Sequence, residues 1–178
     1  MGRTKQLIDW CAADGPKPLV AAAYDAIQPI CGDMVVVVGH DAEAVAAALG
    51  HRMFQRALSD PDGPMFDSIC VGLTAALRID PRATFVLHPA DHPEVDATTL
   101  RTLTNWSLQR PNAAIIPEYR GRGGHPVLIP PVVAQRILAA DCPTGLAGFW
   151  TAQPDLCCRM PVDDPAILRD IDTPSDLV

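Results

Sequence analysis

The sequence has no apolar run long enough to cross a bilayer. Its longest strand-like run, residues 34–38, is far shorter than the ~20 residues that a membrane-spanning helix needs. Residues 1–10 are polar and mixed in charge, whereas a secretory signal peptide has an apolar centre. These absences predict a cytoplasmic protein that does not bind membranes.

An excess of basic residues is also absent. The chain has 14 lysines and arginines against 21 aspartates and glutamates, a formal net charge of -7 at pH 7. Nucleic-acid-binding domains normally carry a basic stripe, so nucleic acid is not the expected partner. A phosphorylated small molecule is compatible with this charge, because a few cations or a bound metal can make one pocket locally positive.

Several common catalytic and metal-binding motifs are missing as well. The sequence contains no G-x-S-x-G elbow, no G-x-G-x-x-G after a strand and no Walker A loop, which argues against those hydrolases and nucleotide-binding folds. The cysteines form no C-x-x-C pair and no zinc-ligand spacing, so we expect buried, reduced thiols. They are Cys11, Cys31, Cys70, Cys142, Cys157 and Cys158.

What the sequence does contain is an alternation of strand-like and helix-like segments. Expected helices lie over residues 18–27, 42–49, 68–77, 96–108 and 131–139, and expected strands over residues 34–38, 52–58, 84–88 and 113–116. Asp41 and Asp96 are the expected N-caps of two of these helices. Continuous apolar strands separated by helices predict an α/β fold with a Rossmann-like, doubly wound, mostly parallel sheet. Its length predicts one domain over residues 1–178.

One carboxylate follows an expected strand. In such sheets, ligands bind beyond the carboxyl ends of the strands, where residues 88–93 read His-Pro-Ala-Asp-His-Pro. Pro89 and Pro93 argue against the helix that a zinc-binding H-x-x-D-H element needs. Asp91 in this stiff turn suits a hard cation such as Mg²⁺, but a carboxylate that only hydrogen-bonds its own backbone explains the pattern equally well.

A second group of carboxylates lies near the C-terminus. Asp170 and Asp172 flank Ile171, so in an extended segment both point to one side, where either could share a metal with Asp91. The alternative is an N-cap at Asp172 or Thr173 before a final helix beginning at Pro174. The spacing alone leaves both interpretations open.

Two segments combine cations with glycine. The N-terminal Gly2, Arg3 and Lys5 could bind a phosphate chain, and arginines flank a glycine-rich loop over residues 120–126. A solvated N-terminus and an exposed turn are the respective alternatives.

Taken together, these segments resemble the cytidylyltransferase branch of the molybdenum-cofactor nucleotidyltransferases, which have a MobA-like NTP transferase domain. Residues 1–7 and 17–20 resemble the end of the family's nucleotide-binding loop and its first helix, and residues 64–73, with Ser68 and Gly72, resemble the segment lining base and ribose. Residues 90–93 stand at the metal-binding D-x-P turn, 124–128 resemble the acceptor-site G-H-P-V-L element, and 170–177 resemble the closing D-I-D-T-P-x-D-L. The resemblance covers essentially the whole chain.

The resemblance implies transfer of CMP from CTP to the phosphate of molybdopterin, with release of pyrophosphate and possible delivery to a molybdoenzyme. CTP is preferred over GTP because the guanylyl branch tends to carry asparagines in the closing motif. The implied catalytic residues are Lys5 and Asp91, and the implied Mg²⁺ ligands are Asp91 with Asp170 or Asp172. The implied nucleotide-binding residues are Gly2, Arg3, Lys5, Gly63 and Ser68, and the implied acceptor-binding residues are Arg122, Gly124, His125 and Pro126.

The main departure from the family lies at the N-terminus. Family members begin with an apolar strand and an L-A-A-G-x-S-x-R loop directly before M-G-x-x-K, and here Met1 is that methionine. The simplest hypothesis is that the start codon was assigned too far downstream and that the native chain is longer. If the short form is the native one, we expect the sheet to lack a central strand, leaving strand edges that invite association. A binding or docking protein with impaired catalysis, and transfer to a sugar phosphate, are the alternative functions. His92 also departs from the residues usual at its position.

Overall fold

The computed structural model describes residues 4–12 and 15–172. The first half contains β1 (Asp9–Ala12), β2 (Gly15–Pro18), α1 (Leu19–Ile27), β3 (Val35–Val38), α2 (Ala42–Ala48), β4 (Gln55–Leu58) and α3 (Met65–Ile79). The second half contains β5 (Phe85–Leu87), α4 (Ala97–Gln109), β6 (Ala114–Tyr119), β7 (Arg122–Gly123), β8 (Val127–Ile129), α5 (Pro131–Leu138), α6 (Gly145–Ala152) and β9 (Cys157–Pro161). The alternation of strands and helices confirms the predicted α/β class.

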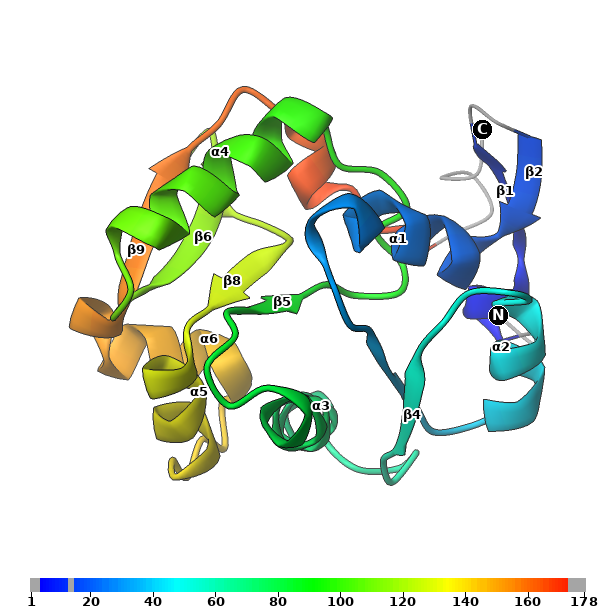
Figure 1. The fold of residues 1–178 in the computed structure, drawn as a ribbon, viewed down its shortest axis with the longest axis horizontal. Helices are drawn as coiled ribbons and strands as arrows, with labels where there is room; N and C mark the ends of the chain where they lie inside the picture. The colour runs from blue at the N-terminus through cyan, green and yellow to red at the C-terminus, as the bar shows by residue number, and fades with distance from the viewer. Residues whose placement is uncertain (1–3, 13–14, 173–178) are drawn as a thin grey trace.

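The strands of the described residues form three sheets: the antiparallel hairpin of β1 and β2, the parallel pair of β3 and β4, and a five-stranded sheet. In the pair of β3 and β4, which we call the smaller sheet, Val35 lies opposite Gln55 and Val38 opposite Leu58. In the five-stranded one, which we call the larger sheet, the order is β5-β8-β6-β7, and β9 runs parallel to β6. In the described part of this sheet, β5 and β9 run in the same direction as β6, so most strands share one direction, as predicted, although β7 and β8 run against them and pair with their neighbours in antiparallel fashion. Within the described residues β3 and β5 are not paired with each other, and Figure 1 shows β6, β8 and β9 to the left and β4 to the right.

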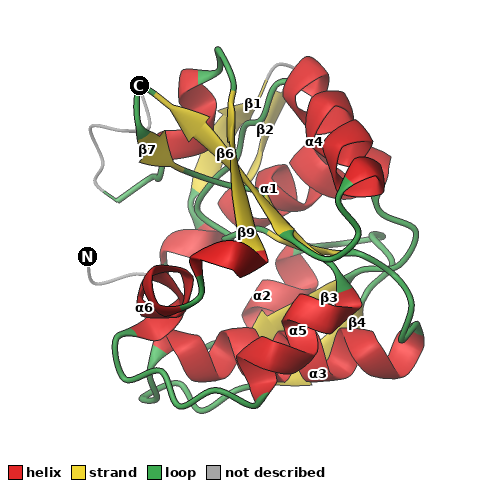
Figure 2. Ribbon diagram, turned by 90° about the vertical axis from the view of Figure 1, so that its left-hand side faces the viewer, coloured by secondary structure: helices red, strands yellow, loops and turns green. Residues whose placement is uncertain are grey.

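Successive side chains of a strand point to opposite faces of the sheet, and helices cover both faces of the larger sheet. Ile115, Leu128 and Met160 face α4 and pack against Leu103. Figure 2 shows α4 on one side of β6 and β9, and α5 and α6 on the other. The residues of the second face and of the helices that cover it are Ala114, Ile116, Val127, Ile129, Val133 and Phe149.

The smaller sheet is covered less completely. Val36 and Val38 pack against Val20 of α1 and Val45 of α2. On the opposite face, Cγ2 of Val37 lies 3.0 Å from where a Cβ on Gly72 of α3 would stand, so this glycine lets the helix approach the strand. Helices therefore lie on both faces of β3, yet only Val38 of this strand is fully buried.

Of the two predicted N-caps, Asp96 is confirmed and Asp41 is wrong. Asp96 accepts a hydrogen bond from the Thr98 amide at 2.6 Å and caps α4. Asp41 precedes α2 with a left-handed φ of 54° and makes no side-chain cap bond. That backbone conformation directs the carboxylate away from the helix amides, and it accepts a hydrogen bond from Thr4 instead.

No helix in the described residues has both the length and the apolar character needed to cross a membrane. The cysteines are free thiols, as predicted, but Cys11 is exposed and the other five are only partly buried. Burial raises the pKa of Cys31 to about 11, which keeps this thiol protonated at neutral pH.

Candidate active site

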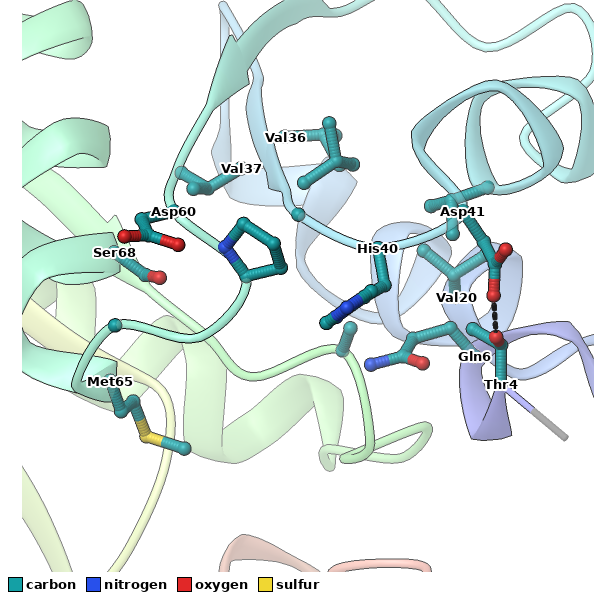
Figure 3. A pocket seen from close by; sticks show the side chains of 16 residues that line it. Thr4, Gln6, Val20, Val36, Val37, His40, Asp41, Asp60, Met65 and Ser68 are labelled. Carbon is teal, nitrogen blue, oxygen red and sulfur yellow. Dashed lines mark hydrogen bonds between the residues drawn. The ribbon is translucent and has the colours of Figure 1, made fainter. Parts of the chain in front are cut away.

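A cavity of about 720 Å³ opens beyond the carboxyl ends of β3 and β4. Gly39, His40 and Asp41 line it from the turn after β3, and Asp60 and Pro61 line it from the turn after β4. Figure 3 shows His40, Asp41 and Asp60 around this space, with the hydrogen bond from Thr4 to Asp41 at one side. The position agrees with the rule that open α/β sheets bind ligands beyond their strand ends.

Gly63 and Ser68, which the sequence predicts to bind the nucleotide, both line the cavity. The amide of Gly63 donates to the carbonyl of Asp60 at 3.2 Å, and the Ser68 hydroxyl bonds that of Ser59 at 3.0 Å. These bonds tie the turn after β4 to the first part of α3. One wall of the cavity is therefore held in place by short-range hydrogen bonds.

Lys5 joins two carboxylates beside the cavity. Its Nζ lies 2.6 Å from Oδ2 of Asp91 and 2.7 Å from Oδ1 of Asp172, and we call these three residues the Lys5 clasp. Burial alone would lower the pKa of Lys5, but the hydrogen bonds to Asp172 and Asp91 raise it above its usual 10.5. The ammonium is therefore charged at neutral pH.

The clasp depends on how Ile171 is buried. Its side chain, 1% exposed, packs with Trp10, Leu19 and Ala22. Its amide donates to the backbone carbonyl of Asp91 at 3.0 Å, which fixes the C-terminal segment against the turn after β5. Asp170 and Asp172 on either side of it are exposed, and Asp172 is the one that shares Lys5 with Asp91.

The turn that carries Asp91 is not helical, as the two prolines predicted. The His92 amide donates to the Pro89 carbonyl at 3.3 Å, and residues 92–96 are irregular. No group of three or more histidines, cysteines, aspartates or glutamates in the described residues could hold a metal ion. Mg²⁺ is commonly held by one or two carboxylates plus substrate phosphates, so Asp91 and Asp172 fit a cation that arrives with a phosphorylated ligand.

Three histidines pack next to this turn. The ring centroids of His88 and His92 are 6.0 Å apart, and those of His92 and His125 are 5.2 Å apart. The Nε2 of His88 donates to the His92 carbonyl at 2.7 Å, whereas the Nδ1 atoms of all three rings are buried and have no partner among the described residues. We call these residues the histidine cluster.

The histidine cluster is uncharged at neutral pH. Burial lowers the pKa of His88 to about 3 and that of His125 to about 4. Burial also lowers the pKa of His92, although nearby Asp91 opposes this. Asp91 therefore gains little positive charge from its histidine neighbours, although Nε2 of His92 lies 3.9 Å from its Oδ1.

The predicted acceptor-binding residues fall into two groups. Gly124 and Pro126 are buried, and a Cβ on Gly124 would stand 2.2 Å from the Ile167 carbonyl oxygen. The His125 amide donates to that oxygen at 2.9 Å, so this close packing places the imidazole in the histidine cluster. Arg122 is exposed on the hairpin of β6 and β7. Gly2, Arg3 and residues 173–178 lie outside the described residues.

Comparison with known proteins identifies the family. The profile of the MobA-like NTP transferase domain matches residues 1–156. The chain belongs to this family. A search of curated proteins gives no match.

Several solved structures share this fold. A Mycobacterium tuberculosis H37Rv protein in complex with manganese is 23% identical, covers 98% of this chain and 90% of its own, and has a TM-score of 0.75. A nucleotidyl transferase from Methanothermobacter is 21% identical, with coverage of 97% and 81% and a TM-score of 0.75. Molybdopterin-guanine dinucleotide biosynthesis protein A from Archaeoglobus fulgidus is 20% identical, with coverage of 99% and 88% and a TM-score of 0.67. At these identities the likeness concerns the MobA-like fold.

Sequence reasoning missed the cavity residues of the turns after β3 and β4. His40, Asp41 and Asp60 follow strands closely, just as Asp91 follows β5. The rule that singled out Asp91 therefore also applies to them. What the sequence did not show is that β3 and β4 are neighbours in one sheet, so that the turns after them face the same cavity.

Proposed function

We propose that this MobA-like protein transfers CMP from CTP to the phosphate of molybdopterin, with release of pyrophosphate, in molybdenum cofactor maturation. The observation that carries this proposal is the Lys5 clasp beside the cavity. Thr4 and Gln6 flank Lys5 in the chain, Ala90 precedes Asp91, and all three of these neighbours line the cavity. A cation and two carboxylates at one cavity suit a nucleoside triphosphate and its divalent ion.

The reaction needs no protein base. A phosphate monoester is already ionised near neutral pH, so an acceptor oxygen can attack the α-phosphorus directly as the bond to the β-phosphate breaks and pyrophosphate leaves. Catalysis then consists of positioning the two phosphates and neutralising their charge. Mg²⁺, when bound, supplies neutralisation, and Asp91 with Asp172 would hold it, with Asp170 adjacent.

Each end of the substrate pair has its own residues. Lys5, with Gly2 and Arg3, would bind the triphosphate, and Gly63 and Ser68 would line the nucleoside. On the acceptor side, His125 would contribute hydrogen bonds only, because its pKa of about 4 keeps it neutral. Positive charge for the molybdopterin phosphate would come from Arg122.

The choice of CTP over GTP rests on two motifs. Residues 124–128 read G-H-P-V-L and residues 170–174 read D-I-D-T-P, both typical of the cytidylyl branch. The neighbour from Archaeoglobus fulgidus is named for the guanine dinucleotide, which makes GTP the competing donor. A molybdoenzyme that receives the product is the expected partner.

The test measures pyrophosphate released from the chain with Mg²⁺, molybdopterin and either CTP or GTP. We expect turnover with CTP, and a loss of roughly a hundredfold or more in Asp91→Asn, because charge neutralisation at the phosphates is lost. Asp33→Asn, an exposed carboxylate in the turn before β3, is the matched control and should retain full activity. Equal rates for Asp91→Asn and the wild type would reject the metal assignment.

Other outcomes identify the alternative functions. Binding of molybdopterin without turnover would identify a docking protein. Turnover with sugar phosphates in place of molybdopterin would identify a different acceptor.

A further inference from the structure

The Lys5 clasp places a positive charge at the position where the proposed function needs a divalent cation. The Lys5 ammonium contacts Oδ2 of Asp91 at 2.6 Å and Oδ1 of Asp172 at 2.7 Å. A divalent cation held by Asp91 and Asp172 would need the carboxylate oxygens that Lys5 contacts. The ammonium and the divalent cation would repel one another at such short range, so both would not occupy these oxygens together.

We propose that Lys5 is an exchangeable counter-ion of the metal site, which the divalent cation displaces so that the ammonium is released toward the triphosphate. The inference rests on the proposed function, which assigns Asp91 and Asp172 to the metal. It adds that Lys5 and the metal occupy the clasp alternately.

The charges around the clasp favour this exchange. Asp91 and Asp172 approach one another, and their like charges would repel without a cation between them. The neighbouring histidine lies farther away, because Nε2 of His92 is 3.9 Å from Oδ1 of Asp91, beyond hydrogen-bond distance. Lys5 holds the two carboxylates together until a divalent ion, with twice the charge, takes its place.

Lysine is suited to such movement. Its ammonium is a compact charge on a flexible four-carbon stem, unlike the planar fork of arginine. Thr4 and Gln6, its neighbours in the chain, line the cavity, so an ammonium that leaves the carboxylates lies next to the space for the phosphates. One side chain thereby stabilises the empty site and then binds the substrate.

The first experiment measures Mn²⁺ binding without nucleotide, by the electron paramagnetic resonance signal of free Mn²⁺. Lys5→Met keeps an unbranched side chain, shorter by the ammonium, and removes its charge, so we expect Mn²⁺ to bind about tenfold more tightly than to the wild type, since no charge-assisted hydrogen bonds must break. Lys17→Met is the matched control. Lys17 is the chain's other lysine and pairs with Asp25 of α1 at 2.8 Å, so Mn²⁺ affinity should not change.

Asp91→Asn separates the two proposals. If it abolishes Mn²⁺ binding while Lys5→Met binds Mn²⁺ no more tightly than the wild type, the exchange is wrong and the metal assignment stands. If Asp91→Asn binds Mn²⁺ as tightly as the wild type, the metal assignment itself is wrong.

A second measurement uses the unaltered chain and does not depend on the stability of a variant. Because the sequence has two lysines, protein labelled with ¹³C at the lysine ε-carbon gives two signals, and Lys5→Arg identifies one of them. Saturating Mg²⁺ should move the Lys5 signal toward that of a solvated lysine and leave the Lys17 signal in place. A Lys5 signal that stays unchanged at saturating Mg²⁺ would overturn the proposal.

Discussion

The smaller and the larger sheet of this MobA-like protein differ in how completely they are buried. In the larger sheet the first four residues of β6 and all of β8 are buried, whereas in the smaller sheet β3 has one buried residue and β4 has none. The cavity lies beyond the ends of these two less buried strands. The larger sheet is thus the more tightly packed frame, and the turns that line the cavity lie on the less tightly packed part.

The Lys5 clasp joins residues from both parts. Lys5 lies in the short turn Lys5–Leu7, whose Leu7 packs with the valines of β3, and Asp91 follows β5 of the larger sheet. Asp172 comes from the C-terminal segment. A cation at this position therefore holds together parts of the chain that the sheet hydrogen bonds do not.

The largest expected effect comes from shortening a buried side chain in the core of the larger sheet. Ile129 of β8 is fully buried, so Ile129→Ala should lower the free energy of unfolding by about 4 kcal/mol through lost burial and a residual cavity. Val36→Ala in the half-exposed β3 should cost only about 1 kcal/mol. Urea denaturation measures both, and equal losses would contradict the difference between the sheets.

The next effect tests the close packing that places His125. Gly124→Ala would put a Cβ 2.2 Å from the Ile167 carbonyl oxygen, and moving that backbone should cost about 3 kcal/mol. Gly32→Ala, where no heavy atom lies within 4 Å of the new Cβ, is the control and should leave the melting temperature nearly unchanged. A thermally stable Gly124→Ala would show that this contact is not rigid.

The histidine cluster predicts loss of stability in acid. His88 and His125 have pKa values of about 3 and about 4 in the folded protein and the ordinary 6.5 when unfolded. Between these values the unfolded chain binds more protons, so the free energy of unfolding rises with pH from about 4 and levels off above about 6.5. At pH 5 each of these histidines should lower the free energy of unfolding by about 2 kcal/mol relative to its value at pH 7.

Denaturation of His88→Gln across this pH range checks that prediction. Removing one titrating group should make the profile flatter than that of the wild type. His51→Gln, an exposed histidine in the turn after α2, is the control and should leave the profile unchanged. A wild-type profile that is flat between pH 4 and 7 would contradict the neutral cluster.

The smallest effect is expected at the surface of the smaller sheet. Arg56 of β4 pairs with Glu43 of α2, whose side chain is 86% exposed. Water and salt screen such a pair, so Glu43→Gln should change the free energy of unfolding by less than about 0.5 kcal/mol. A larger loss in urea denaturation would mean that the smaller sheet depends on this ion pair.

Much of the fold could be predicted because its signals are local. The apolar run at residues 34–38 and the Asp96 cap reflect interactions within a few residues, and both appear where expected. The hairpin of β1 and β2, strand β8 and helix α6 were not predicted. Strand β8 has only three residues, and its antiparallel place between β5 and β6 depends on partners far away in the chain.

For the candidate site, the family motifs and the proline-bounded turn of Asp91 were determined by the sequence itself, because residue type and short spacing suffice for both. Only the tertiary structure decides which carboxylate shares the Lys5 ammonium with Asp91. Burial of Ile171 against Trp10 places Asp172 at Lys5, and the close packing of Gly124 puts His125 into a buried, neutral cluster. Such contacts arise from the packing of segments far apart in the chain, and periodicity along one segment carries no information about them.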